Sequence, residues 1–436
     1  MGQLTARRAI VAAGAAALLA SGCKGDAKEA AASSVRYEGP FAEQVRGTIP
    51  RIERSTGLRF KSPPKLEPRT REQLRAFLEA QFDEERPARE IAAQEAAYKR
   101  LGLLPDTLQL RPLFMRLLQE QVAGYYDPRT KTLYVVEGAS PDIRDVTISH
   151  ELVHALQDQY LNLDSLQQIH GDNDRQTAAQ AAIEGQAMYE QIAAMVGDAN
   201  FAARLPGGWD RVREMVRDSR TAYPVLASAP MVVQETLLFP YLSGAEFVKR
   251  FKEKKRDGTV LSALPASTEQ VMYARAYFDH PDPPTSIALP APRGAQALYD
   301  NALGEFETRL FLFQHLGQLR QADAVRGAAG WDGDRYVLLS TPRGEGIAWL
   351  TVWDGPMEAA EFAELLGDVV RRRFGTTPAG SGGARRATAG GRALAITEAE
   401  VAGRPAVLFV DVPAGTSTDV MDLAAVRLTE GAPAAR

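Results

Sequence analysis

The stretch ISHELVHALQDQ, residues 148–159, carries the strongest structural signal in the chain: two histidines enclose a glutamate and two apolar residues. On an α-helix, residues four positions apart lie on one face, so His150 and His154 present both imidazoles to the same side. Glu151 lies about 100° further round the helix, within reach of a water molecule beside an ion held by the two histidines. The spacing therefore predicts a helix with a metal-binding face.

Two histidines, a glutamate and a polarised water are the parts of a metal-dependent amide hydrolase. Zinc lowers the pKa of a bound water to about 7, and a glutamate base then accepts its proton. The residues that separate and flank the motif are uncharged, as a helix buried behind a metal requires; they are Ile148, Leu152, Val153, Ala155 and Leu156. We expect one Zn²⁺ per chain. The simpler alternative is an ordinary helix that contains two of the five histidines.

A catalytic zinc site needs a third protein ligand and an open fourth position. The stretch AAIEGQAMYE, residues 181–190, offers Glu184 among alanines and a glycine. Small residues let two helices approach closely, and a carboxylate in such surroundings needs a partner such as a cation. Competing ligands in the sequence are His170, Glu190 and Asp158.

The strings HELVHALQDQ and EGQA resemble the gluzincin class of zincin metallopeptidases, and in particular a group of bacterial exported metallopeptidase-like proteins. The metzincin pattern does not fit, because Gln157 and Tyr160 stand where it has glycine and histidine. The resemblance implies that His150, His154 and Glu184 bind zinc and that Glu151 is the general base. The chain departs from thermolysin-type members at Met188, where they carry an aspartate, so the group that orients an imidazole must come from elsewhere.

Zincins also align an extended substrate along an edge strand of a sheet. KTLYVVEG, residues 131–138, is the strand we expect in this place, as the second strand of a hairpin over 124–136. An oxyanion stabiliser is also needed. The candidates are Tyr126, Tyr273 and His280, although Tyr126 beside a turn is also a natural packing residue.

The N-terminus has the pattern of an export signal: MGQLTARR carries two arginines, AIVAAGAAALLA is apolar, and SGC ends at Cys23. Cys23 is the only cysteine, and LLASGC resembles the lipobox of bacterial lipoproteins, whose cysteine is lipidated. The alternative is a plain secretory signal followed by a free thiol. We expect a lipid anchor in the bacterial cell envelope facing away from the cytoplasm. Lys24 after the cysteine favours the outer membrane over the inner one.

The 436 residues divide into four parts by composition and hydrophobic pattern. We expect a signal peptide over 1–22, a flexible tether over 23–65, a zincin-like domain over 66–325 and a small α+β domain over 330–430. Apolar residues at helical spacing dominate the third part, and strand-like runs appear after residue 330. The predicted class is α+β, mostly helical with a small sheet. In GWDGDRY, we expect Trp331 and Asp332 to form a turn and Asp334 to pair with Arg335.

These features together predict a membrane-anchored zinc peptidase that acts on peptide or protein substrates. A net charge of −4 argues against nucleic acid as a partner. A metal-dependent amidase acting on peptidoglycan peptides would use the same chemistry. The alternative outside enzymology is a zincin-fold lipoprotein that only binds partners or assists envelope assembly. The intact Glu151 favours the enzyme, because a scaffold needs no base.

Overall fold

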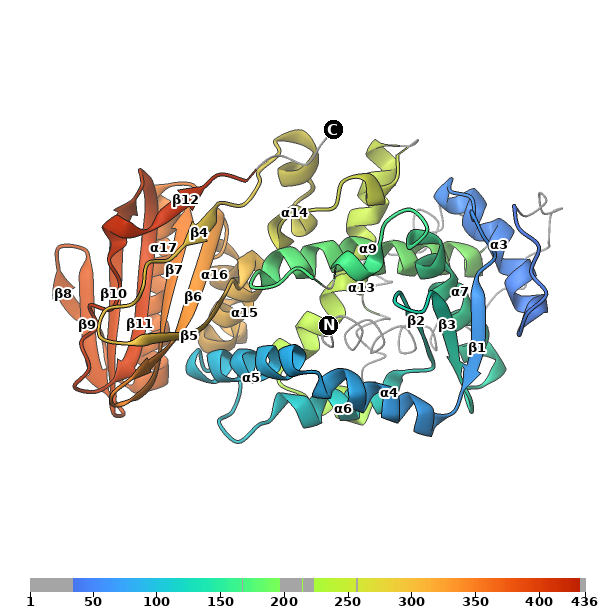
Figure 1. The fold of residues 1–436 in the computed structure, drawn as a ribbon. Coiled ribbons are helices and arrows are strands. Elements are labelled where there is room, and N and C mark those ends of the chain that lie inside the picture. The colour runs from blue at the N-terminus through green and yellow to red at the C-terminus, as the bar shows by residue number, and fades with distance from the viewer. Residues whose placement is uncertain (1–33, 167, 197–213, 215–222, 256–257, 432–436) are drawn as a thin grey trace.

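The computed structural model describes residues 34–166, 168–196, 214, 223–255 and 258–431. The expected signal peptide and Cys23 lie outside these ranges. Among the described helices, none combines the length and apolar character needed to cross a bilayer. The described chain is α+β, as predicted: a large helical part is followed by an antiparallel sheet near the C-terminus (Figure 1).

The helical part is built largely from long helices. Their bounds are α3 (Ala42–Thr56), α4 (Arg71–Asp83), α5 (Glu85–Arg100), α6 (Leu110–Gln121), α7 (Pro141–Gln157), α9 (Asn173–Val196) and α13 (Met231–Lys254). Shorter helices connect them, namely α8 (Leu163–Leu166), α12 (Pro224–Ser228) and α14 (Thr268–Met272). The helix α3 packs on α7 and α9, so the predicted tether over 23–65 is wrong for its C-terminal half. Apolar Val45, Ile49 and Ile52 drive this docking by burying one face of α3.

A small sheet of three strands lies beside α7. It contains β1 (Lys65–Arg69), β2 (Gly124–Asp127) and β3 (Thr132–Val136), in the order β1-β3-β2. The predicted hairpin is confirmed as the antiparallel pair of β2 and β3. The edge position predicted for KTLYVVEG is wrong, because β1 pairs with β3 in parallel and leaves β3 in the centre. The edge strand on the side of α7 is β2.

The helix α7 carries the histidine motif and is buried continuously from Val146 to Gln157. Its start follows from Ser140, whose hydroxyl accepts a hydrogen bond from the N–H of Ile143, and from Pro141 at the first helical position. It packs against α9, α3 and both strands of the hairpin. Such burial explains why the residues around the two histidines are apolar.

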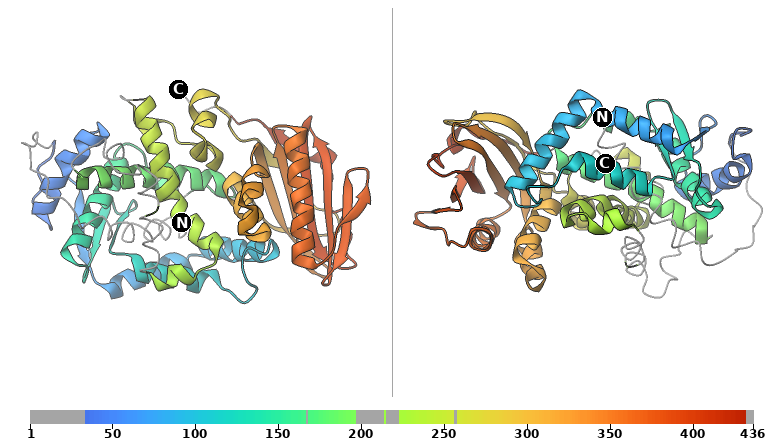
Figure 2. Two further views of the ribbon diagram at one scale, coloured as in Figure 1. Left: turned by 180° about the vertical axis from the view of Figure 1, so that it is seen from behind. Right: turned by 90° about the horizontal axis from the view of Figure 1, so that it is seen from below.

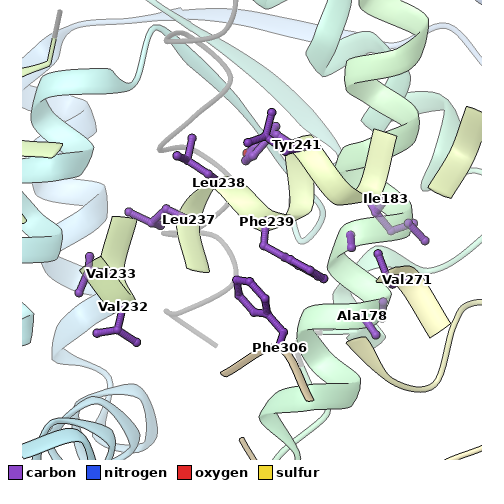
Figure 3. Close-up of a cluster of buried hydrophobic side chains, with 14 of the residues drawn as sticks. Ala178, Ile183, Val232, Val233, Leu237, Leu238, Phe239, Tyr241, Val271 and Phe306 are labelled. Carbon is purple, nitrogen blue, oxygen red and sulfur yellow. The ribbon is translucent and has the colours of Figure 1, made fainter. Parts of the chain in front are cut away.

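The helices α9 and α13 cross in very close contact. A β-carbon on Gly185 would lie 2.1 Å from the carbonyl carbon of Gly244, and one on Gly244 would lie 2.1 Å from the oxygen of Ala181. The glycines therefore allow the two backbones to touch. An apolar cluster that includes Phe239 and Phe306, with ring centroids 4.1 Å apart, continues from this crossing (Figure 3).

The C-terminal part is a seven-stranded sheet in the order β5-β6-β7-β11-β10-β9-β8. Its strands are β5 (Gln296–Asn301), β6 (Trp331–Thr341), β7 (Gly344–Trp353), β8 (Ala379–Ser381), β9 (Ala384–Ala389), β10 (Arg392–Val401) and β11 (Arg404–Pro413). One face is covered by α15 (Gly304–Leu316) and α17 (Pro356–Phe374), and α16 (Gln321–Arg326) packs on α15 (Figure 2). The other face lies under the strand pair β4 (Ser286–Ala288) and β12 (Arg427–Thr429).

The sheet corrects three expectations about its start. It takes in β5, so the domain boundary predicted near 330 cuts through the unit. Trp331 and Asp332 belong to β6, where the register with β7 shifts, and do not form a turn. The predicted pair of Asp334 and Arg335 is also wrong, because neighbouring residues of a strand point to opposite faces.

The two side chains find separate partners on those faces. Asp334 is buried and accepts hydrogen bonds from the indoles of Trp331 and Trp349 at 3.1 and 2.9 Å. It also accepts hydrogen bonds from the N–H groups of Leu303 and Gly304. Arg335 pairs with Asp300.

Candidate metal centre

The fold brings together the three residues that the sequence indicated as ligands. Nε2 of His150 and Nε2 of His154 each lie 3.3 Å from Oε2 of Glu184. One atom from each residue falls within 4.8 Å of the others. The two histidines lie on α7 and the glutamate on α9. All three are buried, with exposed fractions of 0, 2 and 0%.

Two glutamine side chains orient the imidazoles from behind. Nδ1 of His150 lies 2.9 Å from Oε1 of Gln191, and Nδ1 of His154 lies 2.8 Å from Oε1 of Gln157. The amide nitrogen of Gln157 donates to the carbonyl of Ile183 at 3.0 Å. Its oxygen is therefore the acceptor toward His154, whose Nδ1 carries the proton. The lone pair on Nε2 then points toward Glu184.

With both imidazoles neutral, none of the three side chains carries a positive charge to balance the carboxylate. The arrangement therefore fits a bound cation. Burial on its own would raise the pKa of Glu184, but the adjacent His154 and His150 lower it below its ordinary value. That lowering of the pKa needs protonated imidazoles. With neutral imidazoles, a cation bound among the three side chains would keep the carboxylate ionised in the same way. Nε2 of His154 makes no hydrogen bond to any residue that the structure describes. Two imidazole nitrogens and a carboxylate oxygen are the donor set that zinc takes in hydrolytic sites.

The proposed base Glu151 is held by a main-chain group of the neighbouring edge strand. Its Oε2 accepts a hydrogen bond of 2.8 Å from the N–H of Tyr126 in β2. The side chain is 3% exposed, so water reaches it poorly in this structure. The hydroxyl of Tyr126 donates to Asp158 at 2.8 Å, so this tyrosine contacts α7 at both ends.

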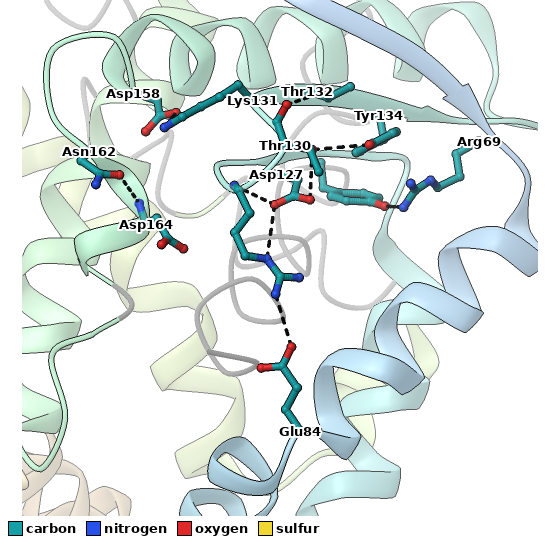
Figure 4. Close-up of polar contacts among 12 residues, drawn as sticks. Arg69, Glu84, Asp127, Thr130, Lys131, Thr132, Tyr134, Asp158, Asn162 and Asp164 are labelled. Atoms are coloured by element: carbon teal, nitrogen blue, oxygen red, sulfur yellow. Dashed lines mark hydrogen bonds and ion pairs between the residues drawn. The ribbon is translucent and has the colours of Figure 1, made fainter.

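The competing ligands have other partners. Asp158 also accepts a hydrogen bond from Lys131 of the hairpin turn at 2.7 Å (Figure 4). His170 lies between Glu90 and Arg86, and Glu190 pairs with Lys252 and Ser55. None of the three belongs to the cluster around His150.

Tyr273 and His280 lie apart from the candidate metal centre. Tyr273 lines a cavity of about 650 Å³ among α13, α14 and α15, where its neighbours include Glu305 and Arg309. His280 is exposed. In the described part of the chain, no hydrogen bond, ion pair or ring contact joins either residue to the two histidines. The aromatic side chain that does approach is Tyr241 of α13, whose ring centroid lies 6.2 Å from that of His150.

Sequence reasoning missed Gln157, Gln191 and Tyr241. Gln157 directly follows the motif and Gln191 lies about two helical turns after Glu184 on α9. Their uncharged amides carry no signal of metal chemistry. The one available hint was Met188, which showed that an orienting group was missing from its usual position.

The comparisons with known proteins concern the other end of the chain. Residues 295–421 match a family described as a domain of unknown function (DUF8575). This segment covers the seven-stranded sheet with α15 and α17, and it contains none of the three candidate ligands. No curated protein and no solved structure matches the chain.

Proposed function

We propose that the protein is a zinc-dependent peptidase whose metal ligands are His150, His154 and Glu184. The observation that carries the proposal is the convergence of two Nε2 atoms and one carboxylate oxygen. The amides of Gln157 and Gln191 support it, because they direct both Nε2 lone pairs to one point. Burying two imidazoles and a carboxylate side by side costs free energy, and a bound cation would offset that cost.

Zinc held there would supply Lewis-acid chemistry, activating water for attack on an amide carbonyl. The chain provides the remaining functions. Glu151 would accept the proton of the attacking water and pass it to the leaving amine. Low exposure around the ligands excludes bulk water, which strengthens each electrostatic interaction inside the site.

The edge strand β2 lies beside Glu151, in the place where zincins align an extended substrate. A hydrogen bond from the N–H of Val136 to the carbonyl of Ala123 begins the ladder with β3. By the alternation of an antiparallel pair, the main-chain groups of Gly124 and Tyr126 face away from β3. They are buried against α7 and face the side of Glu151, so a peptide could add along this edge, beside the proposed metal site, only where β2 separates from α7.

The test combines metal analysis with digestion of a peptide library. We expect about one zinc per purified chain and hydrolysis by the wild type. Glu151→Gln should retain the zinc and lose hydrolysis. Glu79→Gln, at a glutamate whose side chain is 43% exposed and pairs with Arg75, is the matched control and should retain both. Metal-free wild type, or full activity in Glu151→Gln, contradicts the proposal.

The second candidate is a non-catalytic scaffold that binds partners in the cell envelope. The near-complete burial of the ligands favours it, because a substrate needs access to the metal. The same library digest separates the two functions: a scaffold would bind zinc and leave every peptide intact.

We further propose that a lipid on Cys23 anchors the protein to a bacterial envelope membrane, on the side away from the cytoplasm. The support is the apolar segment that ends in LLASGC. One acyl chain gives marginal binding and several give firm binding, at about 0.8 kcal/mol per buried methylene. Cys23→Ser should move the protein from the membrane fraction to the soluble fraction. Retention in the membrane fraction contradicts the lipid anchor.

A further inference from the structure

We infer that Tyr126 is a positioning residue for Glu151, and that its bond to Asp158 is the latch that holds the edge strand β2 against α7. The inference rests on the proposed function, because it assigns Glu151 the role of general base. Its evidence is separate from the metal ligands and comes from two hydrogen bonds at opposite ends of one residue.

The first bond is made by the main chain. Tyr126 lies opposite Leu133 in the hairpin, at a position whose N–H faces away from β3. This N–H would point to solvent on an uncovered edge. It donates instead to Oε2 of Glu151 at 2.8 Å. A carboxylate held by such a bond loses rotational freedom, so its orientation depends on where the strand lies.

The second bond is made by the phenol. The hydroxyl of Tyr126 donates to Oδ2 of Asp158 at 2.8 Å, and Asp158 lies about two turns after Glu151, at the end of α7. Tyr126 therefore spans the same side of α7 from the base to the helix end. Burial raises the pKa of Tyr126 well above its ordinary value, and Asp158 raises it further. The phenol accordingly stays protonated as a donor.

Asp158 is itself fixed in place. Its Oδ1 accepts the N–H of Leu163 at 2.8 Å, and its Oδ2 also accepts the ammonium of Lys131 at 2.7 Å. The carboxylate thus ties together the end of α7, the following turn and the loop of the hairpin. The strand cannot slide along α7 without breaking these bonds. This arrangement keeps the N–H of Tyr126 opposite Glu151.

The test compares two conservative substitutions on the same strand. Tyr126→Phe removes the bond to Asp158 and keeps the ring and the main chain. Tyr125→Phe is the matched control, because Tyr125 is also buried and its hydroxyl bonds to Arg69 on the far side from α7. For Tyr126→Phe we expect kcat to fall by roughly ten- to a hundred-fold, with KM and zinc content unchanged. For Tyr125→Phe we expect kcat, KM and zinc content all to stay at the wild-type level.

A second readout does not need activity. Exchange of the Tyr126 amide hydrogen with solvent should accelerate in Tyr126→Phe and keep its wild-type rate in Tyr125→Phe. If the wild type cleaves no peptide, the proposed function fails while amide exchange still tests the latch. Equal kcat values in the two variants, an unchanged exchange rate at Tyr126, or loss of zinc from Tyr126→Phe would each overturn the inference.

Discussion

The side-chain oxygen of Gln157 accepts a hydrogen bond from Nδ1 of His154, and the amide nitrogen of the same side chain donates to the carbonyl of Ile183. The direction of this bond selects the tautomer of the imidazole and leaves Nε2 as a lone-pair donor. Gln157 lies on α7, whereas Ile183 lies on α9 next to Glu184. One glutamine therefore ties the orientation of His154, a proposed metal ligand on the first helix, to the backbone of the second.

Replacing the orienting amides should weaken zinc binding. Gln157→Leu and Gln191→Leu keep most of the volume and remove the acceptors at Nδ1, so each should lower zinc affinity by roughly 10- to 100-fold. Competition with a chromophoric chelator measures the change. Gln94→Leu is the control, because this buried amide bonds to Tyr98, away from the histidines. Wild-type affinity in both Gln157→Leu and Gln191→Leu would show that the amides do not orient the ligands.

Removing the metal should destabilise the wild type through Glu184. A ligand that binds only the folded state adds about 2.7 kcal/mol of stability at a hundred-fold excess over its Kd. Dialysis against a chelator should therefore lower the Tm of the wild type, and added zinc should restore it. Glu184→Ala should show one Tm under both conditions. A zinc-dependent Tm in Glu184→Ala would move the third ligand to another residue.

The sequence predicted the cluster of His150, His154 and Glu184 better than its surroundings, and the reason is the range of the interactions. His150, Glu151 and His154 lie within about one helical turn, so their relative positions follow from local geometry. The role of Glu184 was predicted with the help of the resemblance to gluzincins, because the contact between α7 and α9 is set by tertiary packing. The supporting amides were out of reach, since nothing in their chemistry distinguishes Gln191 from a surface glutamine.

The strand order was missed for a related reason. The strands β2 and β3 are close in sequence, and the residues between them are typical of a turn, so the hairpin could be predicted. The neighbour β1 comes from residues 65–69, in a stretch whose prolines and lysines resemble a tether. Parallel pairing across such a distance leaves no periodic mark in the sequence. The same holds for β5, which joins the C-terminal sheet from before α15.

Close packing of α9 on α13 should make Gly185 intolerant of a side chain. Gly185→Ala places a methyl group 2.1 Å from the carbonyl carbon of Gly244, and such overpacking costs about 1–3 kcal/mol. Gly47→Ala in α3 is the control, because a β-carbon there meets no atom within 4 Å. An alanine in a helix interior stabilises by roughly 0.5–1 kcal/mol relative to glycine. Chemical denaturation should therefore shift in opposite directions for the two variants. Equal shifts would contradict the close crossing.

A buried acid away from the metal gives the fold a specific pH dependence. Burial raises the pKa of Glu269 to about 10, and repulsion from Glu305 and Asp282 adds to the rise. The folded state therefore keeps a proton on Glu269 that the unfolded chain releases near its ordinary pKa of 4.5. The contribution of protonated Glu269 to the free energy of unfolding is fully present below pH 4.5, and it falls continuously as the pH rises toward 10.

Glu269→Gln is neutral at every pH and escapes this loss. Relative to the wild type, the variant should have a similar Tm at pH 4.5 and a progressively higher one at pH 7 and pH 9. Thermal unfolding at the three pH values measures the difference. Glu79→Gln, at a half-exposed position away from Glu269, should follow the wild type throughout. Parallel curves for Glu269→Gln and the wild type would mean that Glu269 is ionised in the folded protein, and that a cation or a rearranged neighbour compensates its charge.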